Sequence, residues 1–305
     1  MQWKGVMPAM TTPFDRSLRI DVAFAARHAR WLHANGCTGI VCLGSLGEAA
    51  TLTFEEKLQL VRIVVATVSP SIPVVGAVSA LSTADAVTLA KTLADAGVQG
   101  LMILPPYVYK GDWREMRAHL AAIFEATALP AMLYNNPIAY GTDFLPEQIA
   151  ELAAEFENLQ AVKESSADIR RVTAIRALTG NRLALFVGVD DAIVEGIDAG
   201  AVGWIAGLVN AFPRESVELF NLALNGNKQA AFELYRWFLP LLRMDTVPKF
   251  VQLIKQVQEE CGVGSARVRP PRLPLVGAEL EEAKVLVTEA LHHRRAGVPS
   301  SSPLQ

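Results

Sequence analysis

The residue whose type and position most clearly suggest chemistry is Lys163, at the end of the apolar run Leu159–Lys163. Of the nine lysines in the sequence, it is the one expected at the carboxyl end of a buried strand. An ammonium group at the edge of an apolar core is costly to desolvate, so its pKa should fall toward neutrality. The neutral amine can attack a carbonyl or imine carbon and form a Schiff base. The alternative is a lysine whose stem packs on the core while its ammonium reaches water.

Polar and small residues follow several other apolar runs. The turn Gly44–Glu48, with sequence GSLGE, can offer backbone N–H groups and the Ser45 hydroxyl to an anion, or it can be a purely structural strand-to-helix turn. Tyr134 ends the run before that of Lys163, so its hydroxyl can relay protons to an amine or simply bond to the backbone. Asp190 is expected to cap a helix rather than to act as an acid. Candidates at other strand ends are Tyr109, Asn136, Gly188 and Gly207.

These residues can act together only if the elements that carry them meet at one place. Short apolar runs alternate with amphipathic stretches about every 30 residues, the length of a βα unit. Most runs are apolar throughout, as is typical of parallel strands buried on both faces. Eight units predict a closed (β/α)8 barrel of the α/β class, with its chemistry at the carboxyl ends of the strands. The expected strands are Gly5–Thr11, Gly39–Leu43, Val74–Val78, Gly100–Leu104, Ala131–Tyr134, Leu159–Lys163, Leu183–Val187 and Val202–Ala206.

An open, doubly wound sheet would show the same alternation of strands and helices. Its usual nucleotide-binding GxGxxG pattern is absent after the first expected strand, which favours the barrel. The helical stretches carry end signals of their own. Thr53 and Glu56 form a capping-box pattern before the helix Phe54–Val68, and Gly36 and Gly97 are suited to end the helices that precede them.

The eighth helix is expected at Arg214–Leu224, so residues 1–224 form the predicted barrel. Three helical patterns without strands follow, and they predict a helical extension over residues 225–296. Pro240 is expected to interrupt this extension. The Ser- and Pro-rich residues 297–305 are expected to form a loose tail.

Composition excludes several classes of protein. A hydrophobic fraction of 51% in 305 residues indicates a large core, and a net charge of -3 without a basic cluster argues against nucleic-acid binding. No apolar run approaches the roughly 20 residues needed to span a membrane. The start shows no signal-peptide pattern. Cys37, Cys42 and Cys261 lack metal-ligand spacing and suit a reducing compartment, so we expect a cytoplasmic protein without a metal.

Three motifs, in order, resemble the dihydrodipicolinate synthase and N-acetylneuraminate lyase family. They are GxxGE at Gly44–Glu48, YNxP at Tyr134–Pro137 and the pair Lys163-Glu164. The resemblance covers essentially the whole chain. It implies a barrel enzyme for 2-oxo acids that works through a Schiff base on Lys163 without another cofactor, as a homotetramer built as a dimer of dimers. It also implies proton relay by Tyr134 and binding of the substrate carboxylate by Ser45 with the adjacent backbone of Leu46 and Gly47.

The sequence departs from the synthases of this family at three positions. They carry a proton-passing threonine where this chain has Leu46, a second tyrosine where it has Val108, and a carboxylate-binding arginine where it has Ala139. Condensation with aspartate semialdehyde is therefore not expected. Neuraminate lyases need the same threonine that Leu46 replaces.

A branch of the family that deaminates 1-pyrroline-4-hydroxy-2-carboxylate, in bacterial hydroxyproline breakdown, is similar at residues 43–48, 134–141, 163–166, 244–246 and 272–275. This resemblance implies attack of Lys163 on the ring C=N, loss of the C4 hydroxyl, and release of ammonia and 2-oxoglutarate semialdehyde. The substrate would thus be a cyclic imino acid or small 2-oxo acid. Asn136, Tyr140, Tyr109 and Ser165 are the candidates to protonate the departing hydroxyl.

Two alternatives stay open. The first is another lyase of the family, either a dihydrodipicolinate synthase-like enzyme or a 2-keto-3-deoxy acid aldolase or dehydratase. The second is a barrel that binds a small 2-oxo acid without catalysis. The presence of both Lys163 and Tyr134 argues against the second.

Overall fold

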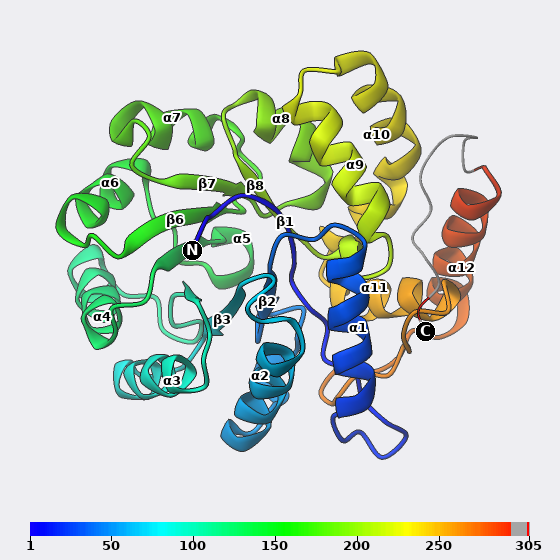
Figure 1. Ribbon diagram of the computed structural model, residues 1–305, viewed down its shortest axis with the longest axis horizontal. Helices are drawn as coiled ribbons and strands as arrows, with labels where there is room; N and C mark the ends of the chain where they lie inside the picture. Colours follow the sequence, from blue (N-terminus) through cyan, green and yellow to red (C-terminus); the bar gives the residue numbers. More distant parts are fainter. Residues whose placement is uncertain (294–303, 305) are drawn as a thin grey trace.

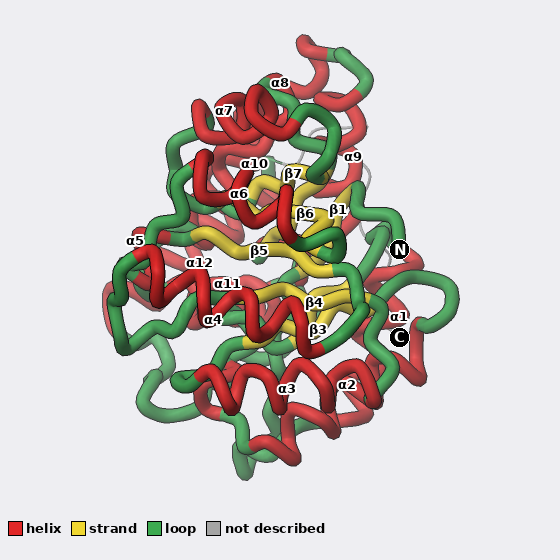
Figure 2. The backbone as a smooth tube through the Cα atoms, turned by 90° about the vertical axis from the view of Figure 1, so that its left-hand side faces the viewer, coloured by secondary structure: helices red, strands yellow, loops and turns green. Residues whose placement is uncertain are grey.

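The computed structural model describes residues 1–293 and 304, and within them eight parallel strands form a barrel surrounded by helices (Figures 1 and 2). Each strand pairs with the next in the order β1-β8-β7-β6-β5-β4-β3-β2. The parallel bridge Ala9–Val41 and a 2.9 Å bond from Met10 N to Val41 O close the ring between β1 and β2. The predicted (β/α)8 barrel is confirmed. The strands are β1 (Gly5–Pro8), β2 (Ile40–Cys42), β3 (Val74–Val78), β4 (Gly100–Ile103), β5 (Ala131–Asn135), β6 (Leu159–Glu164), β7 (Ala184–Val187) and β8 (Gly203–Ala206).

The apolar character of the strands follows from their burial on both faces. Every residue of β3, Val74–Val78, is buried, because one face points into the barrel and the other toward the helices. A glycine in β8 leaves space for a ring from β7. A Cβ built on Gly203 would lie 2.2 Å from the ring of Phe186, so a larger residue would displace that ring.

Helices follow the strands and cover the outside of the barrel (Figure 1). The capping box of α2 is present: Glu56 N donates to Thr53 Oγ1 at 3.2 Å, and Thr53 N donates to Glu56 Oε2 at 2.9 Å. Gly36 and Gly97 have φ of +97° and +89°, as the helix-ending prediction requires. The helices around the barrel are α1 (Val22–Ala34), α2 (Phe54–Val68), α3 (Thr83–Asp95), α4 (Trp113–Ala126), α5 (Pro137–Tyr140), α6 (Pro146–Glu155), α7 (Arg170–Thr179), α8 (Ile193–Asp198) and α9 (Pro213–Leu224).

The extension consists of α10 (Lys228–Leu242), a short 3-10 turn η4 (Arg243–Asp245), α11 (Phe250–Glu260) and α12 (Gly277–His292). The prediction that Pro240 interrupts it is wrong, since α10 continues two residues beyond this proline. Pro240 lies in the last turn of α10, where its missing N–H costs one backbone hydrogen bond. Leu241 and Leu242 are fully buried, and their packing holds the last turn in place. Apart from Leu304, the predicted loose tail lies outside the described residues.

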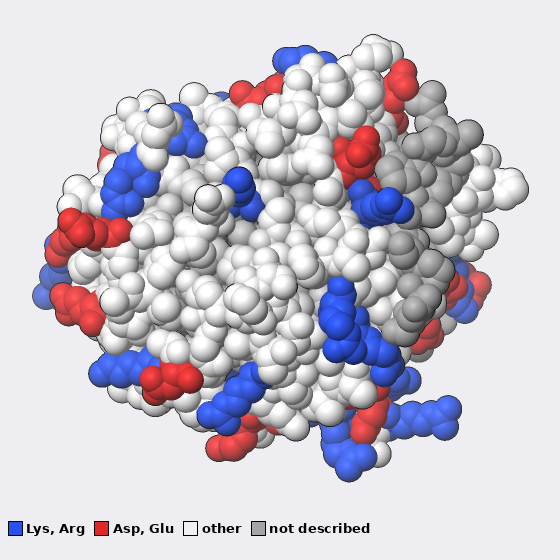
Figure 3. Space-filling view, in the orientation of Figure 1, with Lys and Arg blue, Asp and Glu red and all other residues white. Residues whose placement is uncertain are grey.

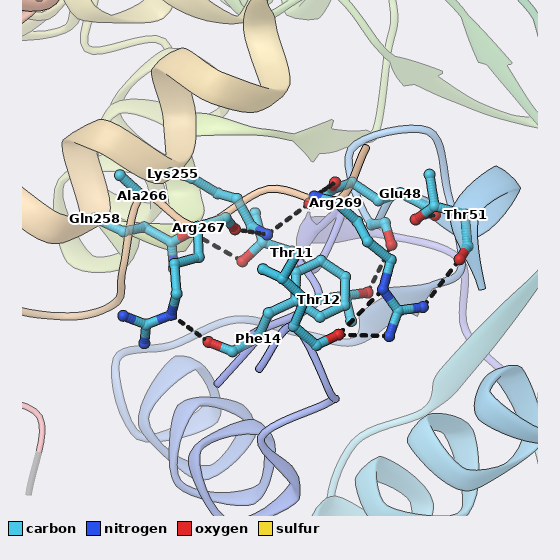
Figure 4. A network of polar contacts seen from close by, with 12 residues as sticks. Thr11, Thr12, Phe14, Glu48, Thr51, Lys255, Gln258, Ala266, Arg267 and Arg269 are labelled. Carbon is cyan, nitrogen blue, oxygen red and sulfur yellow. Dashed lines mark hydrogen bonds and ion pairs between the residues drawn. The ribbon is translucent and has the colours of Figure 1, made fainter. Parts of the chain in front are cut away.

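A buried ion pair fastens the extension to the turn after β2 (Figure 4). Lys255 Nζ of α11 donates to Glu48 Oε1 at 2.5 Å and to Arg267 O at 2.6 Å. Arg269 N donates to Glu48 Oε2 at 2.9 Å. The two charged side chains are 2% and 0% exposed, and burial lowers the pKa of Lys255 to about 8, although Glu48 opposes that shift. The extension therefore holds the turn that carries Ser45.

Figure 3 shows acidic and basic side chains near one another around most of the rim, while mostly basic side chains gather at the lower right, around α1. None of the helices within the described residues is both long enough and apolar enough to cross a membrane.

Lys255→Met is expected to destabilise the protein by about 3–5 kcal/mol, because it leaves the Glu48 carboxylate buried without its cation. The measurement is the free energy of unfolding from a urea titration. Lys249→Met, which breaks an exposed pair with Glu279, is the matched control and should change stability by less than about 1 kcal/mol. Adding Glu48→Gln to Lys255→Met should recover part of the loss. Equal stability of the two lysine variants would contradict this role of the buried pair.

Candidate active site

Lys163 and Tyr134 lie side by side at the carboxyl ends of neighbouring strands. In the β5–β6 register Tyr134 is the partner of Lys163. Lys163 Nζ lies 4.1 Å from the centroid of the Tyr134 ring, and each residue is 6% exposed. The expectation that these two side chains meet agrees with this geometry.

Burial sets the protonation of Lys163. Removal from water lowers the pKa of its ammonium group, and Asp245, Tyr140 and Asp190 oppose this shift to the extent that they are ionised. A lysine with a lowered pKa supplies more free amine near neutral pH, which is the form that attacks a carbonyl or imine carbon.

The glycine after β7 makes room for the lysine. A Cβ built on Gly188 would lie 2.5 Å from Lys163 Cε and 2.0 Å from Ser165 Oγ. Any other residue at this position would displace one of these side chains. Gly188, a candidate from the sequence, thus lies against the side chains of Lys163 and of Ser165, which is also a candidate.

The residues next to Tyr134 and Lys163 in their strands point to the opposite face and tie the strand ends together. Asn135 Nδ2 donates to Glu164 Oε2 at 3.0 Å, and Ser166 N donates to Glu164 Oε1 at 2.6 Å. Asn135 Oδ1 in turn accepts from Phe144 N at 3.0 Å. This set of bonds keeps β5 and β6 in register where Tyr134 and Lys163 meet.

The turn Gly44–Glu48 contacts the site through Tyr140. The hydroxyl groups of Ser45 and Tyr140 form a short hydrogen bond, and the Tyr140 ring meets that of Tyr134 edge-on at 5.8 Å. Among the described residues, none accepts a hydrogen bond from the N–H groups of Leu46 and Gly47. These two donors and the Ser45 hydroxyl can together bind a carboxylate.

Asn136 connects α5 to the phenol of Tyr134. Its Oδ1 accepts from Ala139 N at 3.0 Å and caps α5, while its Nδ2 donates to the Tyr134 hydroxyl at 3.0 Å. Burial raises the pKa of both Tyr134 and Tyr140, and the Asn136 bond works in the opposite direction for Tyr134. A donor to the phenolic oxygen stabilises the phenolate, which is the form that accepts a proton.

Leu46 is 3% exposed and brings no hydrogen-bonding side-chain group to the turn. The hydroxyl group that connects this turn to Tyr134 is that of Tyr140, which is hydrogen-bonded to Ser45 and whose ring meets that of Tyr134 edge-on. Tyr140 belongs to the same chain, since it ends the short helix α5 that follows the Tyr134 strand.

The structure does not bring Tyr109 to this group. Its side chain is 55% exposed, and its hydroxyl donates to both carboxylate oxygens of Glu115 at 3.0 Å. Glu115 belongs to the capping box of α4. Neighbouring Val108 is 75% exposed.

The expectation that Asp190 caps a helix is wrong. Its carboxylate accepts from Trp204 Nε1 at 3.0 Å, from Gly207 N at 3.1 Å and from Leu208 N at 2.9 Å. All three donors lie in or after β8, so Asp190 fastens the end of β7 to the end of β8. Burial raises the pKa of Asp190 to about 6, although these hydrogen bonds act to lower it.

A second carboxylate near Lys163 was not among the site candidates from the sequence. Asp245, in η4 of the extension, packs against Gly207 at the end of β8, where a Cβ would lie 2.0 Å from its Oδ1. Asp245 is far along the chain from any strand, so no periodicity or motif spacing in the sequence connects it with the strand ends. The segment 244–246 stood out only through its resemblance to the deaminase branch.

Among the described residues, no group of three or more His, Cys, Asp or Glu side chains could hold a metal ion. The site offers an amine nucleophile, two phenols beside it, backbone N–H donors for a carboxylate, and two carboxyl groups, of which that of Asp190 is buried and that of Asp245 half-buried.

Comparison with known proteins places this chain in a family. Residues 2–290 match the Dihydrodipicolinate synthetase family. A relative named 4-hydroxy-tetrahydrodipicolinate synthase from Desulforudis audaxviator is 33% identical over 291 residues, 93% of this chain and 97% of the relative. One with the same name from Bartonella quintana is 31% identical, over 95% and 97% of the two chains.

Comparison with solved structures gives the same family. The structure of the 4-hydroxy-tetrahydrodipicolinate synthase from Methylacidiphilum fumariolicum SolV superposes with a TM-score of 0.92 at 27% identity, covering 95% of this chain and 97% of that one. The match of family and fold extends over the barrel and most of the extension, so this chain belongs to the dihydrodipicolinate synthetase family.

Proposed function

We propose that this protein is an enzyme that forms a Schiff base between Lys163 and a small 2-oxo acid or cyclic imino acid. The observation that carries the proposal is the buried Lys163 amine beside the Tyr134 phenol, with a lowered pKa. The turn with Ser45, Leu46 and Gly47 binds the substrate carboxylate, and Tyr134 moves the proton at C3.

Within this class we propose deamination of 1-pyrroline-4-hydroxy-2-carboxylate. The support is the set of groups around the lysine. Buried Leu46 and exposed Val108 and Ala139 stand where the family's synthases carry a threonine, a tyrosine and an arginine. Tyr140, bonded to Ser45, supplies a hydroxyl next to Tyr134 that does not depend on position 46.

The proposed reaction balances with these groups alone. Lys163 Nζ bonds to C2 of the ring imine, and the C2–N bond of the ring breaks to leave an amine on C5. Tyr134 takes a proton from C3, and the enamine electrons form C3=C4 as the hydroxyl leaves C4 as water. Proton shifts move the unsaturation to a C5 imine. One water then releases ammonia at C5, and a second frees the product from Lys163. No metal or organic cofactor takes part.

A second candidate is the reaction in the names of the relatives, 4-hydroxy-tetrahydrodipicolinate synthesis, and it is favoured by the identity of about a third over nearly the whole chain. A 2-keto-3-deoxy acid aldolase or dehydratase is the other alternative within the family. The three reactions differ in their first product: ammonia and a semialdehyde, a condensed ring, or pyruvate or water. A substrate panel scored for these products separates them.

Borohydride added to enzyme and substrate should reduce the imine and leave a stable adduct on the peptide that contains Lys163, because the amine is the one placed to attack. Mass spectrometry of the digest is the measurement. Lys163→Ala should fold and show no adduct and no turnover, while Lys91→Ala, on the exposed side of α3, should behave as wild type. An adduct on another lysine would remove Lys163 from its role.

Leu46→Thr should lower pyrroline deamination, because a hydroxyl brings water toward an amine that the apolar side chain helps to keep neutral. It should not create dihydrodipicolinate synthesis, since Val108 and Ala139 are unchanged. The measurement is a coupled assay of both reactions on wild type and variant. If the wild type condenses pyruvate with aspartate semialdehyde faster than it releases ammonia from the pyrroline, the synthase is the function and the deaminase proposal fails.

The homotetramer stays a prediction. Exposed Leu81, Val108 and Ile138 follow the consecutive strands β3, β4 and β5, the first two in loops and Ile138 in α5, so they share one side of the barrel mouth. Such neighbouring apolar side chains are suited to contact a second copy. We expect light scattering to give the mass of four chains, and Ile138→Asp to lower it, whereas Leu178→Asp, an exposed leucine on α7, should not. A monomer at all concentrations would contradict the assembly.

A further inference from the structure

Asp245 reaches the active site from outside the barrel. It ends η4, the short turn between α10 and α11, and its carboxylate lies against the backbone of Gly207 after β8. A Cβ at that position would lie 2.0 Å from Oδ1 and 2.3 Å from Cγ, so only glycine leaves room for this carboxylate. Gly207 follows β8, and Gly188, which lies against Lys163, follows the neighbouring strand β7. Asp245 is therefore at the same end of the barrel as the proposed reacting groups.

The carboxylate of Asp245 lacks the support that its neighbour has. Oδ1 is buried, and no described residue donates a hydrogen bond to it. Asp190, in contrast, accepts from the Trp204 indole and from two backbone N–H groups. A buried carboxylate without donors is costly, whereas one with three donors is stabilised in its charged form.

Two carboxyl groups that share a buried site divide their protons according to their surroundings. Asp190 is the one suited to stay charged, and Asp245 the one suited to stay protonated. Burial, followed by the charge of Asp190, raises the pKa of Asp245 well above its ordinary value, while Lys163 acts in the opposite direction. Asp191 also faces this group, but its charge is partly matched by Arg243 Nε at 3.5 Å.

We propose that Asp245 is the general acid of this site and gives its proton to the hydroxyl group that leaves C4 of the substrate imine. This assignment rests on the proposed function for the identity of the leaving group. Of the four candidates from the sequence, Tyr109 points to Glu115 and the Asn136 amide has no acidic proton. The hydroxyl groups of Tyr140 and Ser165 are weaker acids than a carboxylic acid, and burial raises the pKa of Tyr140 further.

The step conserves atoms and electrons. Tyr134 first removes the C3 proton to give the enamine; the enamine electrons then form C3=C4, and the C4–O pair departs with the oxygen. The Asp245 O–H bond breaks and its proton joins that oxygen, so water leaves and a carboxylate remains. Asp245 regains its proton from water before the next turnover. Tyr134 has gained one proton and Asp245 has lost one, so the number of protons in the site is unchanged.

The protonation of Asp245 can be measured without any substrate. The infrared difference spectrum of wild type minus Asp245→Asn at neutral pH should contain the C=O band of a neutral carboxylic acid. The same difference for Asp198→Asn, an exposed carboxylate in α8, should contain only carboxylate bands. If the Asp245 difference also contains only carboxylate bands, the residue carries no proton and the proposal is wrong, whatever reaction the enzyme catalyses.

A pair of substrates tests the transfer itself. With 1-pyrroline-2-carboxylate, which has no hydroxyl to lose, Asp245→Asn should still form the borohydride adduct and exchange C3 hydrogen for deuterium within about threefold of wild type. With the 4-hydroxy compound, its ammonia release should fall roughly 10²–10⁴-fold, the usual contribution of a positioned acid. Tyr134→Phe should lower both rates, and Asp245→Glu should recover part of the loss. The pH profile gives a further test. In wild type, the rate of ammonia release from the 4-hydroxy compound should fall as pH rises and Asp245 loses its proton, and the rate of Asp245→Asn should not show this fall.

Each outcome has one reading. Ammonia release by Asp245→Asn within threefold of wild type would overturn the acid role. Equal loss of exchange and ammonia release would make Asp245 a positioning residue instead. If wild type exchanges deuterium yet releases no ammonia from the 4-hydroxy compound, the proposed function fails, and the infrared result still decides whether Asp245 holds a proton.

Discussion

Crowding at the mouth of the barrel is the constraint on which the site depends. Eight parallel strands end within a small volume, and the side chains that follow them must fit there with their polar groups matched. Gly188 and Gly207 have no side chain because Lys163 and Asp245 occupy the adjacent space. The same crowding removes water from the lysine and thereby lowers its pKa. One geometric cause thus selects the glycines and prepares the amine.

Asp190 and Asp245, the two acidic residues near Lys163, differ in their hydrogen-bond donors, and this difference separates their roles. Asp190 is fully buried and Asp245 is half-buried. Asp190 receives bonds from an indole and two backbone N–H groups, while the buried Oδ1 of Asp245 receives none within the described chain. Donors favour the charged form and their absence favours the neutral form. Asp190 can therefore serve as a fixed charge and a link between β7 and β8, which leaves Asp245 free for a different task.

The barrel was predictable because buried parallel strands are apolar throughout and amphipathic helices repeat between them. The meeting of Tyr134 and Lys163 followed from their places at the ends of consecutive strands. The Asp190 contacts were not predictable, since a carboxylate before a helix looks like a cap and its donors come from the next strand. Pro240 looked like a break because the packing of Leu241 and Leu242 cannot be seen in the sequence. Asp245 was missed because no local pattern connects a turn in the extension to the end of β8.

The pair between Lys255 and Glu48 has a consequence for the order in which the protein is made. During synthesis the turn that carries Ser45 leaves the ribosome long before α11 does, so its glutamate must stay in contact with water until Lys255 and the backbone of Arg269 are available. The strands can assemble earlier, because their apolar runs need no partner from the extension. A nascent chain that has completed β8 can thus have a barrel wall while the turn after β2 is still unfastened. The segment from α11 to Arg269 thus fastens the turn that carries Ser45 rather than adding a separate module to the barrel.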